Sequence, residues 1–158
     1  MSVLEISPNS ALSMNTFSVA HNGSMVGQID RQWSGTGAVL MIGGTTYDAG
    51  REGLLSATYY LEANGKRIAT AQRPSLFRRR FVVQTGGKTY TLATTSLFAL
   101  SLVLTENDMQ IGAITRYVTR EMKGEFPDAM ALELQAFLIW LAVLLVRGFA
   151  FPILVAQD

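Results

Sequence analysis

One apolar stretch constrains the fold of this chain more than any other feature. Residues 129–146 read AMALELQAFLIWLAVLLV and form the only long apolar run in the sequence. From Ala136 onward the run has no polar position, so a helix built from it is hydrophobic on every side. Such a helix either crosses a membrane or lies in the middle of a protein. The choice between these two determines the architecture.

The length of the uninterrupted run favours burial within the protein. A membrane span needs about 20 consecutive apolar residues. Here Glu133 and Gln135 interrupt the stretch and leave only residues 136–146 free of polar side chains. We therefore expect a buried helix and not an integral membrane protein.

The flanking residues set the expected ends of this helix. Pro127-Asp128 is typical of a helix start, and Gly148 is typical of a stop. These signals predict a central helix over about residues 128–147, with Glu133 exposed in its first turn near the positive end of the helix dipole. Residues 149–156, which contain Pro152, are predicted to form a final strand.

Two motifs repeat at the same spacing in the rest of the chain. The first reads NGSMVG at residues 22–27, NGKRIA at 64–69 and NDMQIG at 107–112. Each copy has a turn pair suited to positive φ, two variable residues, a β-branched residue and a tiny one. The second motif, GGTTY at 43–47, returns as GGKTY at 86–90. The offsets of 42 and 43 residues predict a repeating unit of about four strands.

Two full units and part of a third give ten to twelve strands between about residues 16 and 120. In the second unit the strands are expected at 57–62, 67–73, 77–84 and 89–93. A period near 40 is also typical of a propeller blade, but a propeller needs more units, and a sandwich leaves no place for an all-round apolar helix. The fold predicted for residues 1–158 is a single domain, mostly β: a closed antiparallel barrel of about twelve strands around the buried C-terminal helix.

Composition narrows the function classes. The chain has no cysteine, which excludes a disulfide, a thiolate metal site and a cysteine nucleophile. Its net charge of +1 does not favour nucleic acid as a partner. The N-terminal residues lack the basic and apolar regions of a signal peptide. We therefore expect a cytoplasmic protein and interpret the sequon Asn22-Gly23-Ser24 as a turn.

No constellation for catalysis stands out. His21 is the only histidine and directly precedes a turn, and no hydrolase, metalloprotease or phosphate-loop signature is present. Gly35-Thr36-Gly37 is interpreted as a loop, and the carboxylates are spread singly along the chain. We expect no catalytic residue, no cofactor and no metal site.

The strongest charge feature is a run of arginines flanked by Phe77 and Phe81. It suggests an anion or lipid-headgroup site, because guanidinium groups bind phosphate in a forked geometry; the alternative is a solvated strand that discourages aggregation. Strand alternation places Arg79 on the face of the two phenylalanines, so we expect a bulge or a carboxylate partner there. The candidate contacts are Lys66, Arg67, Arg73, Arg78, Arg79 and Arg80.

This combination of features resembles the tubby C-terminal-like superfamily, in its branch of LURP-one-related and phospholipid scramblase-like proteins. The resemblance is carried by the strand–Asn-Gly–strand units, the Gly-Gly-x-Thr-Tyr turns, and residues 126–128 leading into 132–138. It implies a twelve-stranded barrel closed around a hydrophobic C-terminal helix. A tubby headgroup motif, the cysteine-rich scramblase segment and a calcium loop have no match here.

The resemblance implies a soluble, non-catalytic binding or interaction module of the LURP-one-related type, with an unidentified protein partner. The alternative is a peripheral membrane protein of the scramblase-like or tubby-like kind that binds anionic phospholipid or phosphoinositide headgroups. Tubby proteins are known as phosphoinositide binders, and scramblases are associated with lipid movement.

Overall fold

A computed structural model shows how the repeat and the helix fit together. It describes residues 1–9, 16–31, 37–53, 56–74, 79–95, 101–117 and 121–155, the side chains of Arg31 and of residues 147–155 excepted. The strands and the helix are β1 Ser2–Pro8, β2 Thr16–His21, β3 Ser24–Arg31, β4 Ala38–Ile42, β5 Thr45–Arg51, β6 Thr58–Ala63, β7 Lys66–Gln72, β8 Arg80–Thr85, β9 Lys88–Thr94, β10 Ser101–Glu106, β11 Met109–Arg116, β12 Met122–Phe126 and α1 Leu132–Val155.

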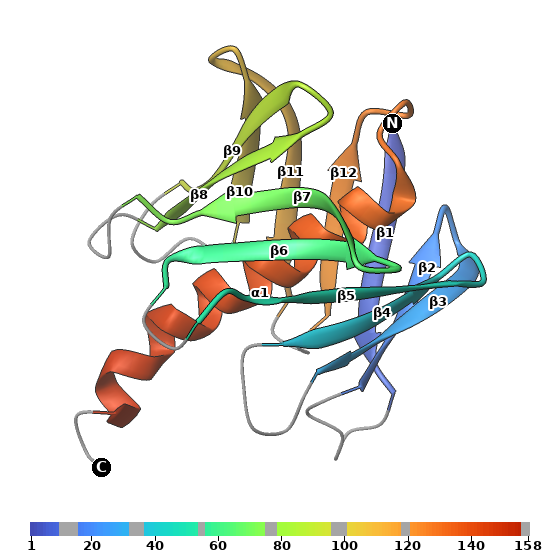
Figure 1. Ribbon diagram of the computed structural model, residues 1–158, viewed down its shortest axis with the longest axis horizontal. Coiled ribbons are helices and arrows are strands. Elements are labelled where there is room, and N and C mark those ends of the chain that lie inside the picture. Colours follow the sequence, from blue (N-terminus) through green and yellow to red (C-terminus); the bar gives the residue numbers. More distant parts are fainter. Residues whose placement is uncertain are drawn as a thin grey trace.

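The strands form one closed antiparallel barrel, which confirms the predicted fold class. Each strand pairs with its neighbours in sequence, and β1 pairs with β12 to close the ring. Helix α1 runs through the inside of the ring (Figure 1). Closure leaves no free sheet edge, and the surrounding strands keep the apolar helix out of water.

The barrel consists of three four-stranded units. The first is β2–β5 and the second is β6–β9. The third is β10, β11 and β12, and its fourth place is taken by β1 from the other end of the chain. The register agrees, because Ser2 pairs with the last residue of β12 just as Thr45 and Lys88 pair with the last residues of β4 and β8.

The repeated hairpin motif has a structural reason for each of its positions. Both turn residues have positive φ in all three copies, from 50° at Asn22 to 87° at Gly23. After each turn the strand pairing shifts by one residue. The residues left without a partner by these β-bulges are the β-branched ones: Val26, Ile68 and Ile111.

In the first and third units, a close backbone approach leaves no room for a side chain at the residue after the bulge. A Cβ on Gly27 would lie 1.7 Å from the carbonyl oxygen of Met41, and one on Gly112 would lie 2.5 Å from that of Glu125. The equivalent position in the second unit is Ala69, which is buried.

The core forms where the inner faces of the strands meet the helix. Trp140 of α1 stacks on Phe137 with 5.9 Å between ring centroids, and Tyr59 packs edge-on against both Trp140 and Phe81. Between residues 134 and 142 every helix side chain is buried, namely Leu134, Gln135, Ala136, Phe137, Leu138, Ile139, Trp140, Leu141 and Ala142.

Several boundaries differ from those predicted. The chain has an additional strand, β1, before residue 16, and α1 begins at Leu132 and remains helical to Val155. The predicted final strand over 149–156 is therefore wrong for the part that the structure describes. The predicted stop at Gly148 does not end the helix, which continues through Gly148 and Pro152. Glu133 is half-buried and not fully exposed.

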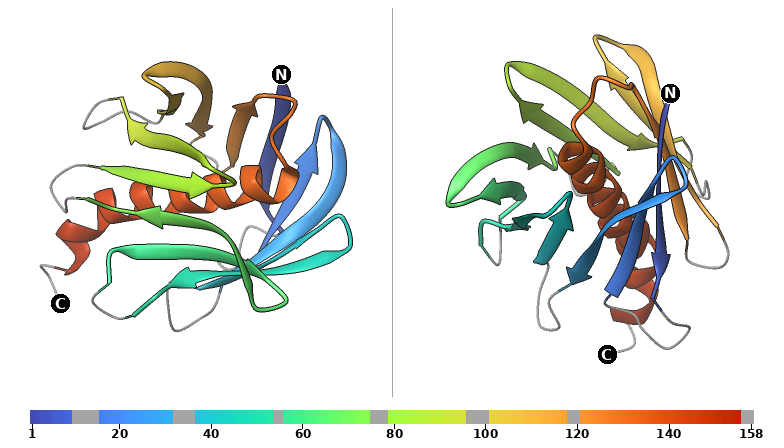
Figure 2. Two further views of the ribbon diagram at one scale, coloured as in Figure 1. Left: turned by 45° about the horizontal axis from the view of Figure 1, so that its top comes forward. Right: turned by 90° about the vertical axis from the view of Figure 1, so that its right-hand side faces the viewer.

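Helix α1 is longer than the barrel that surrounds it. Its 24 residues span about 36 Å at 1.5 Å per residue. The longest strands have 8 residues, which corresponds to roughly 26 Å before their tilt is considered. The C-terminal turns of the helix consequently extend beyond the strands (Figure 2).

Candidate anion-binding site

Three arginines occupy the same position in the three units. Arg31 ends β3, Arg73 directly follows β7 and Arg116 ends β11. Each lies nine residues after the asparagine that opens the hairpin turn of its unit. Because alternate strand residues face the same side, the register places Arg73 and Arg116 on the inner face. The residues two positions before them, Ala71 and Ile114, are buried in the core.

Two further arginines share this register at the same end of the barrel. Arg51 ends β5, two residues after the buried Ala49, and Arg79 lies two residues before the buried Phe81 of β8. We call the end of the barrel at which Arg51, Arg73, Arg79 and Arg116 lie the basic end.

The electrostatics show that two of these charges are close together. Burial lowers the pKa of Arg79, and the positive charge of Arg73 lowers it further. Arg79 is half-buried, and its guanidinium group has therefore lost part of its hydration. The charge of an anion bound beside it would compensate part of that loss. An anionic ligand is therefore favoured between these side chains.

The local hydrogen bonds hold the strands around this end but leave donors available. Arg51 Nε donates to the carbonyl oxygen of Ser56 at 2.8 Å, and the backbone N–H of Arg73 donates to Ala57 at 2.9 Å. Within the described part of the chain, the buried Nε atom of Arg73 has no hydrogen-bond partner. A buried donor of this kind is costly unless a ligand or water accepts from it.

The nearest acidic side chain in the sequence does not neutralise the site. Glu52 follows Arg51 but faces the outside of the barrel, where its carboxylate pairs with Arg67. Arg67 also contacts Glu62 and lies over the ring of Tyr60, 5.0 Å from its centroid. The hydrogen bond to Glu52 raises the pKa of Arg67.

The structure divides the arginines and lysines that the sequence grouped together. Arg73 and Arg79 lie at the basic end, whereas Lys66 and Arg67 begin β7 at the opposite end of the barrel. Arg80 is on the outer face of β8, and Arg78 lies outside the described residues. The predicted bulge is not found between β8 and β9, whose register is continuous. Arg79 directly precedes β8 and is half-buried at the open end.

Sequence reasoning missed Arg51 and Arg116. A signal was available for Arg116, because it follows Arg73 at the period already visible in the turns. Arg51 has no counterpart in the other units and offered no such signal.

The apolar helix leaves the barrel at the basic end. Residues 147–155 continue α1 there, and from position 149 onward they read FAFPILV, without a charged or polar side chain. Figure 2 shows this last part of the helix projecting past the strands. Cationic side chains and an apolar chain segment therefore lie at one end of the molecule.

The opposite end contains a buried polar chain. Ser2 Oγ lies 2.7 Å from His21 Nε2 and donates to Gln135 Oε1 at 3.1 Å. Gln135 Nε2 donates to the carbonyl oxygen of Met130 at 2.8 Å. Since the serine proton points to Gln135, His21 Nε2–H must be the donor to Ser2. The serine is 3% exposed, and its hydrogen bonds connect the helix to β1 and β2.

Across the residues that the structure describes, no three histidine, aspartate or glutamate side chains gather where they could hold a metal ion. The described part of the chain also contains no helix long and apolar enough to cross a membrane. Comparison with protein-family models, curated proteins and solved structures found no match for the chain.

Proposed function

We propose that this protein is a non-catalytic binding module of the LURP-one-related type, and that it binds anionic phospholipid surfaces through its basic end. One observation carries the proposal. The inward register of Arg51, Arg73, Arg79 and Arg116 coincides with the end at which the apolar helix leaves the barrel. The central-helix barrel is also the architecture that the resemblance to tubby-like and scramblase-like proteins implies.

The two parts of this surface suit the two layers of a membrane face. Guanidinium groups form bidentate, charge-assisted hydrogen bonds with phosphate. The apolar residues 149–155 have the composition of segments that enter the boundary between headgroups and acyl chains. Neither signal alone holds a protein at a membrane for long, whereas a basic patch combined with an apolar segment does. The cytoplasmic leaflet, which carries the anionic lipids, would be its location.

Co-sedimentation with vesicles tests the proposal. The protein is expected to pellet with phosphatidylserine-containing vesicles and not with phosphatidylcholine vesicles, and raising the salt concentration should release it. Each cation near such a surface contributes about 1 kcal/mol. Reversing two charges, in the double variant Arg73→Glu and Arg116→Glu, should therefore weaken binding by about 4 kcal/mol, or roughly a thousandfold.

A matched control uses the other end of the molecule. Lys66→Glu together with Lys88→Glu makes the same change in net charge on exposed side chains and should leave vesicle binding nearly intact. Equal binding to neutral vesicles, or equal loss in the two double variants, contradicts the proposed surface. A protein that stays in the supernatant with both kinds of vesicle is not a lipid binder, and a soluble interaction module for a protein partner is then the function.

A further inference from the structure

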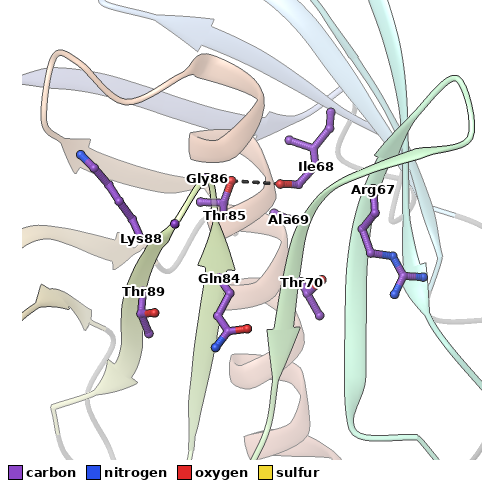
Figure 3. A pocket seen from close by; sticks show the side chains of 10 residues that line it. Arg67, Ile68, Ala69, Thr70, Gln84, Thr85, Gly86, Lys88 and Thr89 are labelled. Atoms are coloured by element: carbon purple, nitrogen blue, oxygen red, sulfur yellow. Dashed lines mark hydrogen bonds between the residues drawn. The ribbon is translucent and has the colours of Figure 1, made fainter.

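One seam of the barrel is less complete than the others. Strands β7 and β8 pair at three positions, ending with Thr70 opposite Gln84. Beyond this pair the two strands diverge, and a cavity of about 430 Å³ lies between them (Figure 3). We call it the β7–β8 groove. It is far from the basic end, next to the Gly86-Gly87 turn.

Pairing at this seam begins later than in the first unit. In the first unit β3 and β4 remain paired through Gly27 and Ile42, at a spacing so close that a Cβ on Gly27 would clash with Met41. In the second unit pairing begins one residue later, at Thr70, and in the third unit it likewise begins at Ala113.

A hydrogen bond that closes the first unit is replaced in the second. The N–H of Gly43 donates to the carbonyl oxygen of Val26 at 3.0 Å. In the β7–β8 groove the equivalent carbonyl, that of Ile68, accepts instead from the hydroxyl of Thr85 at 3.0 Å (Figure 3). Gly86, the equivalent of Gly43, therefore does not make this backbone hydrogen bond to Ile68. Its N–H lies at the rim of the groove.

The third unit provides an internal comparison. Its equivalent of Gly43 and Gly86 is Pro127, which has no N–H to donate. A second cavity, of about 340 Å³, lies at the same place between β11 and β12. Its lining includes Glu125 at the position that Gln84 holds in the β7–β8 groove.

The lining of the β7–β8 groove is polar and has no carboxylate. Thr70, Gln84 and Thr89 are cross-strand neighbours on the outer face, and Lys88 extends from the start of β9 (Figure 3). Arg67 also lines the groove, but its guanidinium group is held by Glu52 and Glu62. Lys88 is therefore the charge that a ligand would meet.

We propose that the β7–β8 groove binds the main chain of an extended peptide that carries acidic side chains. Diverging strands offer main-chain hydrogen bonding that a peptide in strand conformation can complete, as in other cases of β-strand addition. The N–H of Gly86 would donate to a peptide carbonyl, and the hydroxyl and amide groups of Thr70 and Gln84 would contact neighbouring positions. Lys88 favours glutamate or aspartate among the peptide side chains.

Amide chemical shifts of the full-length protein test this inference. The probe is an acetylated and amidated hexapeptide of alternating glutamate and valine, and its counterpart has lysine in place of glutamate. The acidic peptide should cause saturable shifts at Ala69, Thr85, Gly86 and Lys88, and the basic peptide should not. Shifts that inorganic phosphate reproduces at the same concentration would overturn the peptide assignment, as would shifts centred on Arg73 and Arg116.

Gln84→Glu introduces the carboxylate that the third unit already has. It should weaken binding of the acidic peptide about tenfold, whereas the reverse change, Glu125→Gln, should leave shifts in the β7–β8 groove unchanged. Equal effects of these two variants would overturn the site. A positive vesicle result with no peptide binding rejects this inference alone, since the two surfaces lie at opposite ends of the barrel.

Discussion

Two leucines of the central helix that look equivalent in the sequence differ in burial, and should therefore differ in how much their replacement destabilises the protein. Both Leu141 and Leu144 lie in the apolar run, and a polar residue at either position is expected from the sequence alone to unfold the domain. In the structure Leu141 is 0% exposed, whereas Leu144 is only partly buried. The two positions should therefore differ greatly in their tolerance of asparagine.

The magnitude for Leu141→Asn follows from two terms. Removing a buried leucine side chain costs about 2–5 kcal/mol, including the cavity that remains. An asparagine amide without partners adds about 1–3 kcal/mol. The sum, about 5 kcal/mol, is comparable to the whole stability of many domains. Leu144→Asn can keep its amide partly hydrated, so we expect a loss of about 1 kcal/mol.

Urea unfolding monitored by tryptophan fluorescence measures this difference. Trp140 stacks on Phe137 inside the core and should report loss of packing; a Trp33→Phe background removes the second tryptophan from the signal. Leu141→Ala serves as the intermediate variant, with an expected loss of about 3 kcal/mol. If Leu141→Asn unfolds at the wild-type urea concentration without lipid or detergent, the central-helix packing is refuted. A larger loss for Leu144→Asn would refute the assigned helix face.

Three further substitutions test the hairpin units and the polar chain. Asp108→Gly should raise the free energy of unfolding by about 0.5 kcal/mol, because Asp108 has a φ of 64° that glycine adopts without strain. A lower urea concentration at the midpoint of unfolding would contradict the turn assignment. Gly27→Ala should lower it by about 2 kcal/mol, since the new Cβ meets the carbonyl of Met41, and an unchanged thermal midpoint would argue against the close strand approach. Ser2→Ala should cost about 1–3 kcal/mol by leaving Gln135 Oε1 unsatisfied, and the added substitution Gln135→Leu should recover part of the loss, which a purely local effect of Ser2 would not allow.

The fold was predictable because two independent constraints agree. The strand repeat fixed the number and order of most strands, and the all-round apolar run required an enclosed space. The end of the helix was not predictable from local signals. Gly148 and Pro152 normally end or bend a helix, but residues 149–155 are entirely apolar, and α1 continues through them to Val155.

The candidate site was only partly predictable, because a run of charges in the sequence is not a cluster in space. Lys66 begins the seven-residue strand β7 and Arg73 directly follows it, so the two side chains lie at opposite ends of the barrel. Conversely, Arg73 and Arg116 are 43 positions apart and share one end, since they stand at the same register of two units. Periodicity therefore relates Arg73 to Arg116, the local run of arginines contributes Arg79, and neither signal points to Arg51.

The role of β1 explains how two complete units and the three strands of a third make a closed ring. A two-residue turn after β12 would continue the chain into a fourth strand, but Pro127-Asp128 directs it into the helix instead. The third unit then lacks a strand, and its edge could pair with another molecule. β1 fills this place while also pairing with β2, and Ser2 connects it to Gln135 of the helix. The same strand therefore closes the barrel and fixes the position of its core, although its sequence shows no trace of the repeat.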